Sequence, residues 1–298
     1  MKKELIEHKV AFIYVPAIFI IIITLTFLFG MMNNGNVWQR GAFVASNSDA
    51  RFDLFNFTYA ASVMGWLLFM LIMLFFYFAA SFSSDRKDNA LLFWKSLPVS
   101  DLQIISTKTI AGMIMFPIVI MAWSIIAAIA TYIAFLLVSI NIPIVSALNL
   151  APSVPTFLNL LASMLVLFTL TLLWYLPLFS AVGLLGTILR GWAVPAFILI
   201  MLVGSGVEAL ATFSGEGYFA ALMEQRFKAP FIILSEILPN MEHANPINEL
   251  KLTEIISIKN FAPNFASSID WVGMILGWVA AGIFIFIASE YRRRRIQA

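Results

Sequence analysis

Long stretches of this chain contain no charged residue, and short polar segments separate them. The uncharged stretches cover more than half of the 298 residues and are residues 10–39, 54–84, 109–189, 191–207 and 271–289. A helix needs about 20 mainly apolar residues to cross about 30 Å of hydrocarbon. The pattern therefore predicts membrane-spanning helices.

The longest uncharged stretch is interrupted near its middle by residues that break helices. Asn141, Pro143, Pro152 and Pro155 predict a loop there, so the stretch holds two spans. Six spans are predicted in all, at about 10–32, 57–82, 104–138, 157–186, 193–213 and 269–289. The expected fold class is an all-α polytopic membrane protein, formed by a single transmembrane domain over 1–298 that membrane lipid surrounds.

The composition restricts the classes of protein to which the chain can belong. Only 11% of the residues are charged, against about 25% in a typical soluble domain. A soluble enzyme, a nucleic-acid binder and a disordered chain are therefore disfavoured. The net charge of +2 is too small to imply a polyanionic partner, and the absence of Cys leaves no disulfide or thiolate site.

The distribution of Lys and Arg predicts the orientation. If both termini are cytoplasmic, the cytoplasmic side holds 12 of the 18 basic residues and the outer side holds 6. Loops rich in Lys and Arg stay in the cytoplasm. We therefore expect a multi-pass protein with both ends inside, in which residues 83–103 face the cytoplasm and 214–268 face outward. The outer segment is expected to contain a re-entrant or surface-lying helical pair.

The cytoplasmic segment 83–103 has helix signals of its own. Asp85 is predicted to cap a short helix that Pro98 ends. Ser100 and Gln103 have the spacing of a capping box, which would start the third span at a fixed point. Such an element suits contact with another cytoplasmic protein, and the alternative is a helix lying on the lipid headgroups with Phe93 and Trp94 buried.

The run D-R-K-D-N-A-L-L-F-W-K-S-L-P-V-S-D at 85–101 resembles the corresponding segment of bacterial permease subunits in the type-two family of ABC transporters. The head at 4–9 is similar to the amphipathic elbow helix that opens those subunits. The six-span layout with a large outer segment before the last span is also similar. The specific motif is confined to about 85–108.

The resemblance implies that 83–103 carries a coupling helix, which docks on a separate ATPase subunit. The residues that it marks for ATPase coupling are Asp85, Arg86, Lys87, Asp88, Leu91, Trp94, Lys95 and Pro98. It further implies two ATPase subunits, a second permease that is identical or similar, and a location in the bacterial cytoplasmic (inner) membrane. The chain has no G-x-x-x-x-G-K-[ST] motif. ATP and Mg are therefore expected on the partner ATPase, with no cofactor and no enzymatic activity in this chain.

Residues of the second and fifth spans are candidates for the substrate path, because these spans border the pathway in the family. Tyr59, Ser62 and Trp66 share one helical face at i, i+3 and i+7, and the fifth span adds Met201, Ser205 and Glu208. Ordinary helix packing is the alternative for each. For Glu208 the alternative is an acid at the helix end, where Gly204-Ser205-Gly206 would interrupt the helix.

The last span carries small residues at Gly273, Gly277 and Ala281, which favour close helix packing, within the chain or at a dimer face. We find no catalytic constellation, and no metal site is expected, because His8 and His243 are predicted on opposite sides of the membrane. The leading function is an ATP-driven exporter subunit for an amphipathic, lipid-, peptide- or drug-like solute. The alternatives are a sodium-export permease of the same family, and a channel or membrane scaffold without ATP coupling.

Overall fold

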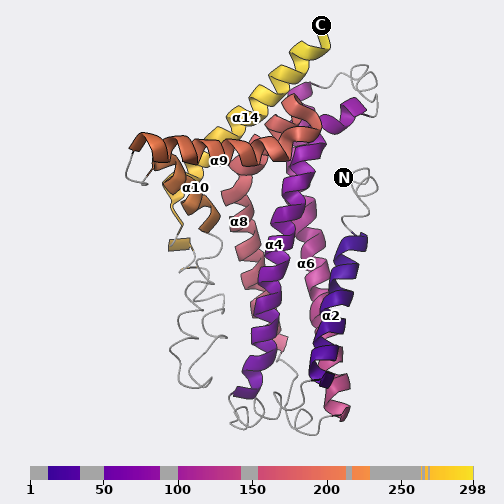
Figure 1. The fold of residues 1–298 in the computed structure, drawn as a ribbon. Coiled ribbons are helices and arrows are strands. Elements are labelled where there is room, and N and C mark those ends of the chain that lie inside the picture. Colours follow the sequence, from indigo (N-terminus) through magenta and orange to yellow (C-terminus); the bar gives the residue numbers. More distant parts are fainter. Residues whose placement is uncertain are drawn as a thin grey trace. The chain divides into compact units, whose positions relative to one another are not determined.

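The computed structural model describes residues 13–33, 50–87, 100–141, 154–212, 217–228, 263, 266–267 and 269–297. Within these ranges the regular structure is entirely helical (Figure 1). Most of the predicted coupling segment lies outside them, including Asp88, Leu91, Trp94, Lys95 and Pro98. The predicted elbow at 4–9 and the stretch 229–262 also lie outside the described residues.

Each predicted span coincides with a helix. The helices are α2 (Val15–Asn33), α4 (Ala50–Lys87), α6 (Asp101–Asn141), α8 (Val154–Leu189), α9 (Ala193–Thr212), α10 (Tyr218–Lys228) and α14 (Trp271–Gln297), with a 3-10 turn η2 at Arg190–Trp192 between α8 and α9. Five of them are long and apolar enough to cross a membrane, over Ser62–Phe82, Asp101–Ala134, Leu161–Leu189, Ala193–Ala211 and Trp271–Arg294. The polytopic membrane class is thus supported, and α2, with 19 mostly apolar residues, is the remaining predicted span.

Three helices are longer than a bilayer is thick. α4 has 38 residues, α6 has 41 and α8 has 36, which corresponds to about 54 to 62 Å of helix at about 1.5 Å per residue. The hydrocarbon layer measures about 30 Å. These helices therefore extend beyond it on at least one side.

One local prediction was wrong, and one alternative is excluded. Asp85 does not cap a new helix, because α4 continues without a break to Lys87; no Gly or Pro interrupts the sequence between Phe82 and that point. The helix break considered as the alternative for Glu208 is absent, because α9 continues through Gly204-Ser205-Gly206 to Thr212, in agreement with the predicted fifth span. A Gly in a helix interior lowers helix stability but does not force a break.

The chain divides into two compact units. Unit 1 comprises Met1–Phe69, Pro117–Phe168 and Ile233–Ser267, and unit 2 comprises Met70–Phe116, Thr169–Ile232 and Ser268–Ala298. The boundaries fall inside α4, α6 and α8, so the units share these helices. The single domain over 1–298 stays a prediction.

The core of unit 2 is formed by facing stripes of α4 and α8. Phe78 and Phe179 are fully buried and stack with ring centroids 5.5 Å apart and planes 4° from parallel. Gly186 on α8 lies against the backbone carbonyl of Ala79 on α4, where a Cβ atom has no room. Small residues at this point let the two backbones approach closely.

Unit 1 has an aromatic core of its own. The buried Trp66 meets Phe19 of α2 edge to face, with centroids 5.5 Å apart and an interplanar angle of 80°. Phe69 contacts both rings. Farther along, the Ser124 hydroxyl of α6 lies 3.4 Å from the Met164 sulfur of α8. These contacts attach α2 to α4 and α6 to α8.

We predict that Gly186→Ala destabilises the protein, because the new methyl group meets Ala79 backbone rather than a side chain that can move. Overpacking of this kind costs about 1–3 kcal/mol, seen as a lower melting temperature of the purified protein in detergent.

Gly282→Ala is the matched control, since nothing lies within 4 Å of its Cβ position. This substitution is expected to be neutral or slightly stabilising, because Ala is the better helix former. Equal melting temperatures for Gly186→Ala and the wild type would contradict the close approach.

Candidate functional site

The start of α6 is fixed by a reciprocal capping box. The Ser100 hydroxyl accepts a hydrogen bond from the Gln103 backbone N–H at 3.2 Å, and the Gln103 side-chain oxygen accepts one from the Ser100 N–H at 3.1 Å. The predicted capping box is therefore confirmed. Because two otherwise unpaired donors are satisfied, the point at which the chain enters α6 is well defined.

The next residue joins α6 to the end of α14. The Arg292 Nε lies 2.9 Å from an Asp101 carboxylate oxygen. The Arg292 side chain is 3% exposed and that of Asp101 25%, so the pair is largely removed from water. Removing one partner of such a pair is strongly destabilising, because it leaves the other charge buried and unpaired.

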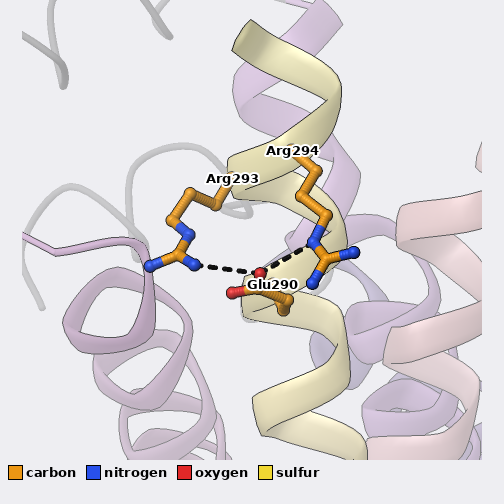
Figure 2. A network of polar contacts seen from close by, with 3 residues as sticks. All are labelled: Glu290, Arg293 and Arg294. Atoms are coloured by element: carbon orange, nitrogen blue, oxygen red, sulfur yellow. Dashed lines mark hydrogen bonds and ion pairs between the residues drawn. The ribbon is translucent and has the colours of Figure 1, made fainter.

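The neighbouring arginines of α14 behave differently. Arg293 and Arg294 both donate to Glu290 on the same helix, at 3.0 and 2.8 Å (Figure 2). Their side chains are 65% and 78% exposed. Exposed pairs within one helix contribute little to stability. Among these three consecutive cations, Arg292 is the one that pairs with another helix.

A second buried cation connects α6 to α4. The Lys108 ammonium donates to the Ser81 carbonyl at 2.8 Å, and the Tyr77 hydroxyl donates to the Lys108 carbonyl at 3.2 Å. All three groups are buried. A helical carbonyl has a second lone pair that accepts such a donor without breaking the helix. The helices on either side of the predicted coupling segment are thereby joined.

Glu208 fixes the turn from α9 to α10. Its carboxylate oxygens accept hydrogen bonds from the backbone N–H groups of Phe219 and Ala220, at 2.7 and 2.9 Å. These donors lie in the first turn of α10, where a helix has no backbone partners for its N–H groups. The Glu208 carboxylate thus caps a second helix in this structure.

Arg226 on α10 is the most enclosed cation of this region. It is 9% exposed, and its guanidinium carbon lies 4.2 Å from the centre of the Trp174 ring. It donates to the Trp174 carbonyl at 3.1 Å and also to the Gly273 carbonyl. Burial lowers the pKa of Arg226, and the Asp270 carboxylate opposes this effect. Arg remains charged because its ordinary pKa is so high.

Arg226 reaches α8 beside a proline. Pro177 has no N–H, so the carbonyl of Leu173, four residues earlier, lacks its usual helical donor. The Trp278 indole N–H of α14 donates to that carbonyl at 3.0 Å. Side chains of α14 and α10 therefore donate hydrogen bonds to backbone carbonyls of α8 near Pro177. We call the set Leu173, Trp174, Pro177, Arg226 and Trp278 the Pro177 site.

Small residues make room for these groups. A Cβ on Gly277 would meet the Arg226 guanidinium and the Pro177 ring, and one on Gly273 would meet the Asp270 carboxylate. Asp270 accepts the Gly273 N–H at 3.0 Å and so caps α14. Ala281 is buried. The stripe predicted from the sequence thus contributes to packing within this chain.

The predicted path residues occupy two units. In unit 1, Tyr59 and Ser62 belong to α4, with Ser62 half-buried, and Trp66 is buried in the aromatic core. In unit 2, the Ser205 hydroxyl donates to the Met201 carbonyl of its own helix at 2.9 Å, and Glu208 caps α10. Among the coupling residues, Asp85, Arg86 and Lys87 form the last turn of α4.

Sequence reasoning missed Arg226, Trp278 and the partner of Arg292. Pro177 was a usable signal, because a proline inside an apolar span implies an unpaired carbonyl that a neighbouring side chain must satisfy. Across the part of the chain that the structure describes, no group of three or more His, Asp or Glu residues has the arrangement of a metal site. The arrangement therefore consists of helix ends and the part of α8 around Pro177, connected by buried cations.

Comparison with known proteins gave no match: a scan against protein-family models, a search of curated proteins and a search of solved structures each returned none.

We predict that Glu208→Ala loosens α10, because Phe219 and Ala220 lose their acceptor. Loss of a cap costs about 0.5–2 kcal/mol, measured as faster hydrogen–deuterium exchange of the amides at 218–228.

Glu208→Gln distinguishes the capping role of the Glu208 side chain from a role of its negative charge. Gln keeps one acceptor oxygen and removes the charge, so a capping role predicts an effect smaller than that of Ala. Equal effects of Gln and Ala would contradict capping and favour a role for the charge itself, as expected of a carboxylate on a substrate path.

Proposed function

We propose that this chain is the transmembrane permease subunit of an ATP-driven exporter of the type-two ABC family. The observation that carries the proposal is the 85–101 run, with its resemblance to the coupling segment of that family. Five helices able to span a membrane support it, with α2 as the proposed sixth span. Both termini and the 83–103 segment are then cytoplasmic.

The energy source in this proposal is a separate pair of ATPase subunits. Closure of the ATPases around ATP would push on the 85–101 segment, which is continuous with α4 on one side and α6 on the other. The Ser100–Gln103 capping box and the Lys108–Ser81 contact favour movement of both helices together. Their tilt would open a seam between two permeases alternately to each side.

The cargo class follows from the charge pattern. The spans carry few ionisable groups, and Lys108 is engaged by a backbone carbonyl. Ion-coupled pumps place ionisable groups along their pathway. An amphipathic solute of lipid, peptide or drug type therefore suits this chain better than a bare ion, with sodium export as the alternative within the same family.

The first test is co-purification. Affinity-tagged chain, solubilised from native membranes with a mild detergent, is expected to bring down a protein with a Walker motif, identified by mass spectrometry. Recovery without any ATPase, under conditions in which a known ABC permease retains its own, would overturn the exporter and favour a channel or scaffold.

The second test concerns coupling. We expect Trp94→Ala and Pro98→Ala to leave membrane insertion and nucleotide binding by the partner intact. Both are expected to uncouple ATP hydrolysis from hydrophobic-dye export in inverted vesicles, because they remove an anchor and a helix stop from the proposed contact.

Trp192→Ala is the control for this test, since it removes an indole that is 72% exposed. Export at the wild-type rate by both Trp94→Ala and Pro98→Ala would contradict the coupling role.

A further inference from the structure

The two ends of α14 make different kinds of contact. Near its C-terminus, Arg292 is buried and pairs with Asp101, the first residue of α6. The adjacent Arg293 and Arg294 are exposed and pair with Glu290 of α14 itself. The Asp101–Arg292 ion pair therefore joins the α6 N-terminus directly to α14.

Near its N-terminus, α14 touches the Pro177 site. Trp278 donates to the Leu173 carbonyl that Pro177 leaves unpaired, and the Gly273 carbonyl accepts from Arg226. Gly277 lies against both the Arg226 guanidinium and the Pro177 ring. The first turns of α14 therefore contact both α8 beside Pro177 and Arg226 near the end of α10.

The stretch between these two ends is uninterrupted helix. α14 contains no proline from Trp271 to Gln297. The 19-residue interval from Gly273 to Arg292 corresponds to about 28 Å at about 1.5 Å per residue. Met274, Ala281 and Ala288 are buried along one side. A continuous helix packed along its length moves as a unit, so displacement at one end reaches the other.

We propose that α14 acts as a rigid connecting helix, or rod, which transmits movement of the α6 N-terminus at Asp101–Arg292 to α8 and α10 at the Pro177 site. The use of this rod in transport rests on the proposed function, because the coupling segment is what precedes Asp101. The mechanical link does not rest on it. The Asp101–Arg292 pair and the Pro177 site lie near the two ends of one helix, so in this proposal a change at either end affects the other.

The test measures hydrogen–deuterium exchange of the purified full-length chain in lipid nanodiscs, without ATP or a partner. Arg292→Gln is expected to speed exchange of the α10 amides at 218–228 about tenfold, because local opening is sensitive to small changes in free energy. The amides of α2 are the internal reference for global unfolding.

Arg294→Gln is the matched control. It removes the same charge from the same helix end, but its partner lies on α14. We expect α10 exchange in this variant within about twofold of the wild type. The double variant D101R/R292D restores the pair with reversed charges and should return α10 exchange toward the wild-type rate.

The link must also act in the opposite direction. Trp278→Phe withdraws the donor from the Leu173 carbonyl and should speed exchange in the first turns of α6. Pro177→Ala gives α8 a backbone donor for that carbonyl, so Trp278→Phe should have a smaller effect in the Pro177→Ala background.

The proposal for α14 fails if Arg292→Gln leaves α10 exchange unchanged. It also fails if Arg294→Gln speeds α10 exchange as much as Arg292→Gln does. A charge-reversed pair that leaves α10 exchange fast would also overturn it. If no ATPase co-purifies with the chain but these exchange changes are seen, the exporter proposal fails and the proposal for α14 stands. The two proposals can therefore fail independently.

Discussion

The constraint on which this structure most depends is that a helix in hydrocarbon has no water to complete its backbone hydrogen bonds. α8 breaks its own pattern at Pro177, and the missing donor comes from Trp278 of another helix. Arg226, on a third helix, donates a hydrogen bond to the neighbouring carbonyl of Trp174. A defect in one helix therefore specifies where two others must lie, and it does so more precisely than apolar contact, which has no preferred direction.

Buried cations in this chain are satisfied largely by carbonyl oxygens. Lys108 donates to Ser81, and Arg226 donates to Trp174 and Gly273. Carbonyl dipoles spread the compensation over several groups, and beside Arg226 the Asp270 carboxylate adds to it. Asp101 and Arg292 are the exception, an ion pair where two helix ends meet. These charged side chains thus determine how neighbouring helices are placed. Hydroxyl groups such as that of Ser205 instead donate hydrogen bonds to carbonyls of their own helix.

The sequence was sufficient to predict the helices and insufficient for their contacts. Charge-free stretches and breakers located the five helices that are long and apolar enough to cross a membrane, and the Ser100–Gln103 spacing predicted a cap that is present. These are local signals, which depend on a few neighbouring residues. The roles of Arg226 and Arg292 depend on partners 52 and 191 positions away, and no periodicity encodes such pairs. Asp85 misled because Asp, although it favours caps, is tolerated in the interior of a helix that continues past it.

The length of α6 has a consequence for its depth in the membrane. From Thr109 to Asn141 it carries no charge, and this part alone corresponds to about 50 Å of helix. Hydrocarbon about 30 Å thick covers only part of it. A shift along the bilayer normal by one turn exchanges apolar surface for apolar surface at the two faces, so hydrophobic matching exerts almost no restoring force. Hydrophobic matching therefore does not fix the depth of α6, which is set instead by the polar contacts near its Asp101 end.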